Sequence, residues 1–188
     1  LETGSFYPIA LFGLEEGQNL FLDDQDMWDA TYIPLMSRRH PFLIAMQSSG
    51  DKSDDKKPVI SIDMGNPRVN EIEGELLFKD DGQPSTYTKQ IMKILESIHL
   101  GNQSNSDFIS EILELDLLES FTLEVTLSDG SKHALSGFYT IKETTLNNLK
   151  KDQLALLQKK GYLLPIYMAV ASHARMRSLV DKKDKRVG

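Results

Sequence analysis

The sequence predicts an α+β fold with short N-terminal strands, a central helical segment, a β-hairpin near residues 121–141 and C-terminal helices. The hairpin is the clearest element, because residues 121–127 alternate in type, Asp129-Gly130 is a turn dipeptide, and residues 133–141 form a returning strand. Apolar residues recur at helical spacing within residues 85–118 and again towards the C-terminus. Strands at both ends of one long helical segment favour α+β over a repeating βαβ order.

The expected N-terminal strands are apolar runs bounded by turn residues. They cover residues 6–14, 42–46 and 59–62, and the last two are expected to pair across a polar loop at 47–57. A short helix or turn is expected within residues 28–39, with Pro34 in its first turn and Pro41 ending it. Another short helix is expected over residues 71–78.

Helical spacing is strongest in two later segments. In the first, apolar residues recur before and after a polar stretch at 101–105, which we expect to interrupt the helix. In the second, Leu154 and Leu157 belong to an apolar stripe that ends at Gly161, a residue suited to a helix C-cap. A final helix is expected over residues 162–180.

Length and composition predict one domain covering residues 1–188. The chain has no cysteine, which excludes disulfides and a cysteine nucleophile. A net charge of −7 disfavours nucleic-acid binding, and the basic residues at 182–186 are expected to extend a solvated helix end. No apolar run reaches the length of a membrane span. We expect a cytoplasmic protein, with association at the cell surface as the alternative.

No group of residues matches a known catalytic or metal-binding pattern. The four histidines (40, 99, 133 and 173) lack helix-face ligand spacing, so we expect no metal and no cofactor. The aspartates at 23, 24, 26 and 29 lack the Gly and terminal Glu of a calcium loop and predict an exposed turn. There is no Gly-x-Ser-x-Gly elbow and no phosphate loop. We therefore expect no catalytic residues, which disfavours an enzyme.

One stretch concentrates the residue types that anchor recognition surfaces. It contains the candidate ligand-binding residues Trp28, Tyr32, Arg38, Arg39 and His40. Arginine grips a carboxylate through two parallel hydrogen bonds, and an aromatic ring packs on the ligand beside it. In the alternative interpretation the aromatic rings belong to the core and the arginines pair with the chain's own carboxylates.

Several stretches together resemble the bacterial SapC family. They are residues 11–21, 32–34 with 38–42, 73–78 with 80–82, 123–130, 135–139 and 160–162, and the likeness runs from about residue 6 to about residue 179. The family is named after a protein associated with a bacterial paracrystalline surface layer, and the resemblance carries no catalytic residues over to this chain. Family members usually have more sequence before the Phe6 region, so N-terminal residues are expected to be missing.

Two classes of function follow as hypotheses. The first is a non-enzymatic binding or assembly component linked to the cell envelope or surface layer, with a protein, a peptide or an envelope component as partner. A structural layer subunit would be its self-assembling form. The alternative is a cofactor-dependent enzyme or accessory protein whose site brings together scattered residues such as His40, His133, Arg38 and the aspartates.

Overall fold

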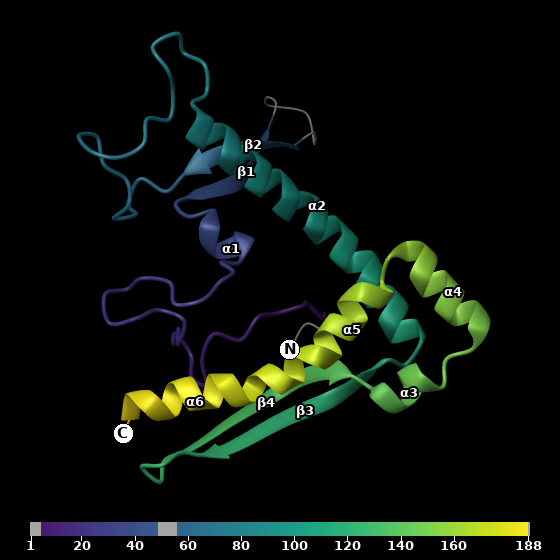
Figure 1. The fold of residues 1–188 in the computed structure, drawn as a ribbon. Coiled ribbons are helices and arrows are strands. Elements are labelled where there is room, and N and C mark those ends of the chain that lie inside the picture. The colour runs from purple at the N-terminus through teal and green to yellow at the C-terminus, as the bar shows by residue number, and fades with distance from the viewer. Residues whose placement is uncertain (1–4, 49–55, 188) are drawn as a thin grey trace. The chain divides into compact units, whose positions relative to one another are not determined.

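The computed structural model describes residues 5–48 and 56–187 and confirms the α+β class, with helices and two separate two-stranded antiparallel sheets (Figure 1). The chain forms two compact units. Unit 1 consists of residues 1–29 and 105–188, and unit 2 of residues 30–104. A single family domain over residues 1–188 stays a prediction.

Unit 2 is built on a β-ribbon. Strands β1 (Phe42–Ser48) and β2 (Lys56–Ile62) pair antiparallel with Phe42 opposite Ile62, so the predicted pairing is confirmed. The short helix α1 (Leu35–Arg38) begins directly after Pro34, where a proline is tolerated because the first N–H groups of a helix have no intrahelical acceptor. The buried core combines one ribbon residue with the first half of α2: Phe42, Ile91, Ile94 and Leu95.

Helix α2 (Thr86–Glu114) runs through both units without a break, so the interruption expected at residues 101–105 is wrong. The Ser85 hydroxyl accepts the N–H of Thr88 at 3.1 Å, which caps the helix start. Apolar positions before and after the polar stretch continue one helical pattern and are buried in both units. Packing at the two ends thus outweighs the weak helix propensity of Gly101 and its neighbours.

Unit 1 contains the predicted hairpin, formed by β3 (Leu118–Thr126) and β4 (Lys132–Ile141). Helices α3 (Glu143–Asn147), α4 (Lys151–Lys160), α5 (Leu163–Ser172) and α6 (Met176–Val187) follow, and α6 lies along the hairpin (Figure 1). The main core combines one residue from each of α2, β4, α3, α4 and α5 with Leu117, which directly precedes β3: Ile112, Leu117, Ile141, Leu146, Leu157 and Ile166. A smaller cluster joins Leu14, Leu20 and Leu179.

The C-terminal helices follow the sequence pattern with one difference. Gly161 adopts a left-handed conformation (φ 76°) and ends α4, as predicted. The single helix expected over residues 162–180 is instead divided by a 3-10 turn at His173–Arg175, and its second part, α6, extends to Val187.

Two predicted elements are absent from the described residues. Residues 6–14 form no strand, because this segment pairs with no neighbouring strand and Tyr7 and Ile9 are exposed. The helix expected over residues 71–78 is a series of bends. There the Asn70 side chain accepts the N–H groups of Ile72 and Glu73, and Gly74 has a φ of 117°.

Candidate functional site

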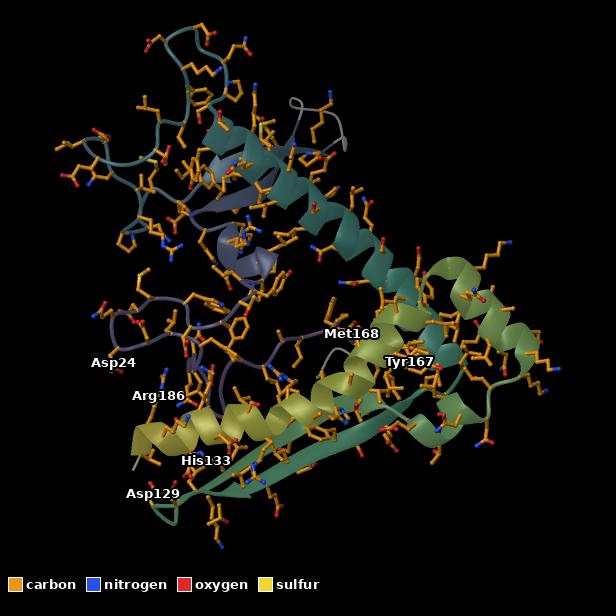
Figure 2. The ribbon with its side chains drawn as sticks, viewed as in Figure 1. Asp24, Asp129, His133, Tyr167, Met168 and Arg186 are labelled. Carbon is orange, nitrogen blue, oxygen red and sulfur yellow. The ribbon has the colours of Figure 1, made fainter. Side chains whose placement is uncertain are left out.

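Helix α5 is apolar on two opposite faces. Ile166 is fully buried on one face, where Leu163 and Val170 also pack against the main core of unit 1. On the other face Leu164, Tyr167 and Met168 are 71%, 52% and 62% exposed (Figure 2 labels the last two). Their i, i+3, i+4 spacing places the three side chains next to one another on the helix surface. We call these three residues the α5 face.

Single exposed apolar side chains are common on proteins, but adjacent ones are less so. In the other helices and strands of unit 1, large exposed apolar residues lie singly, at Leu113, Tyr139 and Leu156. The sequence signal for the α5 face was present in residues 162–171, which are apolar around the whole helix. A helix that is apolar all round is normally buried on every side, and α5 is buried on one side only.

A second feature of unit 1 is a set of polar contacts around Glu15. Its Oε1 lies 3.2 Å from His133 Nδ1 and 3.1 Å from Lys183 Nζ. The side chains of His133 and Lys183 are only 14% and 11% exposed, whereas that of Glu15 is 49% exposed. These contacts join the N-terminal segment, the hairpin and α6, which are far apart in the sequence. We call these three residues the Glu15 cluster.

The cluster continues to the hairpin turn in an order that resembles a hydrolase triad. His133 Nε2 lies 3.3 Å from the Ser131 hydroxyl, and Nδ1 faces the Glu15 carboxylate. The Ser131 hydroxyl, however, donates to Asp129 Oδ1 at 2.6 Å, so its proton is not directed at the imidazole. The same hydrogen bond is the main cause that lowers the pKa of Asp129.

Four backbone N–H groups of the turn are already engaged and are not available to a developing oxyanion. The N–H groups of Leu127, Gly130 and Ser131 all donate to acceptors within the turn, and that of Ser128 donates to Asp184. An acyl-transfer site needs such donors directed at the reacting oxygen. The contacts around His133 hold segments of unit 1 together, and the Ser131 hydroxyl is directed at Asp129 and not at the imidazole.

The expected solvated helix end is only partly confirmed: α6 extends through the basic residues and Lys185 is exposed, but Lys182, Lys183 and Arg186 contact other segments of unit 1. Lys182 Nζ donates to Asp29 Oδ2 at 2.7 Å, and Arg186 donates to the carbonyls of Asn19, Leu20 and Leu22. The hydrogen bond and the charge of Lys182 lower the pKa of Asp29. The missed signal was the charge complementarity between an acidic N-terminal segment and a basic C-terminal helix.

Trp28, the first predicted ligand-binding residue, packs against two phenylalanines. Its ring stacks on Phe21 with centroids 5.8 Å apart and meets Phe12 edge-on at 5.7 Å. The neighbouring aspartates form the expected turn, since Asp23 Oδ1 accepts the N–H groups of Gln25 and Met27.

The other four predicted residues belong to unit 2, whereas Trp28 belongs to unit 1. Tyr32 is 67% exposed, and Arg38 and His40 are also exposed around α1. Arg39 is half-buried, and its guanidinium donates to the Phe42 carbonyl at 2.8 Å. A common ligand for these five residues stays a prediction.

The family model for SapC matches residues 1–179 of the 188-residue chain. The chain belongs to the SapC family. Comparison with curated proteins and with solved structures yields no match. Within the described part of this SapC-family chain, no helix is long and apolar enough to cross a membrane.

The remaining histidines of this SapC chain have local partners. His173 contacts the Thr140 hydroxyl and stacks on Phe121 with centroids 5.3 Å apart, and His99 contacts Gln103. Residues 5–48 and 56–187 contain no group of three or more His, Asp and Glu side chains placed to hold a metal. His40 and Arg38 belong to unit 2 and His133 to unit 1.

Unit 1 of the SapC chain also has a cleft of about 540 Å³ between β3 and α6. Its lining includes Glu124, Asp181 and Asp184, together with Arg177. Two of these carboxylates are already bound, because Asp181 pairs with Arg177 and Asp184 accepts the Ser128 N–H. The α5 face, in contrast, is formed by large, mostly apolar side chains that are more than half exposed, so it is the candidate site that we develop.

Proposed function

We propose that this SapC-family protein is a non-enzymatic binding or assembly component linked to the bacterial cell envelope or surface layer. It binds through the α5 face of unit 1. One observation carries the proposal: Leu164, Tyr167 and Met168 are more than half exposed and adjacent on a helix whose opposite face is in the core. Exposed apolar patches of this kind mark interaction surfaces.

The polar groups of unit 1 support the same conclusion. His133, Lys183 and Lys182 bind Glu15 and Asp29 and so connect segments of the fold. In this account they keep the N-terminal segment on α6, and α5 supplies the contact with the partner. The aromatic and basic residues at 28–40 are proposed only as an additional contact surface.

The test is binding to a washed bacterial envelope fraction, measured by co-sedimentation. The variant L164Q/M168Q removes apolar contact area from the α5 face, and L156Q is the matched control because Leu156 is a 40% exposed leucine on α4. We expect the wild type and L156Q to sediment with the envelope and the double variant to remain in solution. Equal sedimentation of all three proteins would refute the proposal.

A further inference from the structure

We infer that the α5 face docks on the surface of an anionic phospholipid bilayer. This inference names the partner of the face and therefore rests on the proposed function. It starts from the distribution of charge along the chain. Residues 150–188 carry ten Lys or Arg and three Asp or Glu, a net charge of +7, whereas residues 1–149 carry 11 basic and 25 acidic side chains, a net charge of −14.

The α5 face thus belongs to a basic C-terminal fifth of an acidic chain. At physiological salt, charges act over about 8 Å, so the charge close to the face matters more than the net charge of the protein. Arg175 follows Leu164, Met168 and Ala171 at helical spacing and is exposed, which places it at the C-terminal end of the same face. Lys159, at the end of α4, is exposed as well.

Several basic residues of the region are already paired. Lys160, Lys182 and Lys183 form ion pairs within unit 1. The side chains of Arg175 and Lys159 have no hydrogen bond or ion pair to any residue in the described ranges. They are therefore available to the phosphate groups of lipids, and each basic side chain near an anionic surface contributes about a fivefold gain in binding.

The kind of side chain on the face also fits a bilayer surface. Leucine and methionine enter the acyl boundary, and tyrosine has an apolar ring and a polar hydroxyl, which suits the level of the headgroups. Helices that bind in this way combine one apolar face with nearby Lys or Arg.

The size of the face argues against a stable dimer as the alternative. With side chains of about 200 Å² each, the exposed fractions of Leu164, Tyr167 and Met168 amount to roughly 370 Å². A stable protein interface buries about 800 Å² per partner, more than twice this area. A bilayer needs no complementary partner surface, and its binding strength adds apolar contact to electrostatic attraction.

The probes are vesicles of phosphatidylcholine alone and vesicles in which part of it is replaced by phosphatidylglycerol, with binding measured by co-sedimentation. We expect binding to the anionic vesicles and much weaker binding to the neutral ones. The variant R175Q should bind the anionic vesicles about fivefold more weakly, and L164Q/M168Q roughly tenfold or more weakly. The controls K132Q on the exposed hairpin strand and L156Q on α4 should bind like the wild type.

Equal binding to the two vesicle types, binding to neither, or equal losses in the variants and their controls would overturn the inference. The two proposals fail differently. If the wild type does not bind vesicles but L164Q/M168Q still weakens sedimentation with the envelope fraction, the partner is an envelope component other than the lipid bilayer, and only the lipid inference is wrong. If L164Q/M168Q leaves envelope binding unchanged, the proposed function is wrong.

Discussion

Helix α5 offers a direct comparison between its two faces, because Ile166 and Met168 are two residues apart and differ in burial from 0% to 62% exposed. The perturbation is truncation of each to alanine. Ile166→Ala removes three buried carbon atoms, worth about 0.8 kcal/mol each, and leaves a cavity, so we expect a loss of about 3 kcal/mol. Met168→Ala removes atoms already in water and should change the free energy of unfolding by less than about 0.5 kcal/mol.

The assay is urea unfolding followed by Trp28 fluorescence. Trp28 is the only tryptophan and belongs to unit 1, so its emission reports the unit that contains α5. In thermal unfolding of a chain of this length, followed by the same fluorescence, a loss of 3 kcal/mol corresponds to a decrease of about 6–12 °C in Tm. Similar destabilisation by both variants would show that Met168 is packed in the folded protein, and the α5 face would no longer be a free surface.

Three further predictions concern the contacts that shape unit 1. Gly161→Ala should lower the free energy of unfolding by about 1 kcal/mol, because the φ of residue 161 is 76°, whereas Gly101→Ala inside α2 should raise it by up to about 1 kcal/mol. Thermal unfolding measures both changes, and changes of the same sign would contradict the assigned conformations. Lys183→Met should lower the free energy of unfolding by only about 1 kcal/mol, because its partner Glu15 is half solvated, and should speed proteolysis within residues 5–29. Lys185→Met, at an exposed position of the same helix, should change neither the stability nor the proteolysis rate. The lowered pKa of Asp29 means that its pairing with Lys182 contributes stability above pH 3.8, the ordinary pKa, and that this contribution is lost as the pH falls through the lower folded value. Asp29→Asn should therefore lower the stability at pH values above the folded pKa of Asp29 and leave it unchanged below that value. A loss of stability confined to alkaline pH would count against the pairing.

Local signals were enough to predict the elements that depend on neighbouring residues. The hairpin follows from alternation and the Asp129-Gly130 turn, and the end of α4 follows from Gly161. The ribbon of unit 2 was also predicted, because both strands are apolar runs beside one loop. The failures at residues 6–14 and 71–78 have different causes. Residues 6–14 have no partner strand among the described residues, and Tyr7 and Ile9 are exposed. In residues 71–78 the Asn70 side chain accepts the first N–H groups, and Gly74 has a φ of 117°.

The candidate site was harder to predict because it depends on tertiary structure. The sequence showed that residues 162–171 are apolar, but which face of α5 meets the core is decided by Leu157, Ile141 and the other residues around it. The long-range pairs Glu15–Lys183 and Asp29–Lys182 are separated by more than 150 residues and leave no periodic signal. The aromatic and basic stretch at 28–40 was visible in the sequence, yet Trp28 belongs to one unit and Arg38 to the other.

The central claim is that the α5 face is where this protein meets its partner. The chain has no cysteine, so Met168→Cys places one environment-sensitive dye on the face, and Ala155→Cys places the same dye on an exposed position of α4 as the control. On addition of the washed envelope fraction, the account predicts a blue shift of the dye emission at position 168 and none at position 155. An unchanged spectrum at position 168, or equal shifts at the two positions, would contradict it.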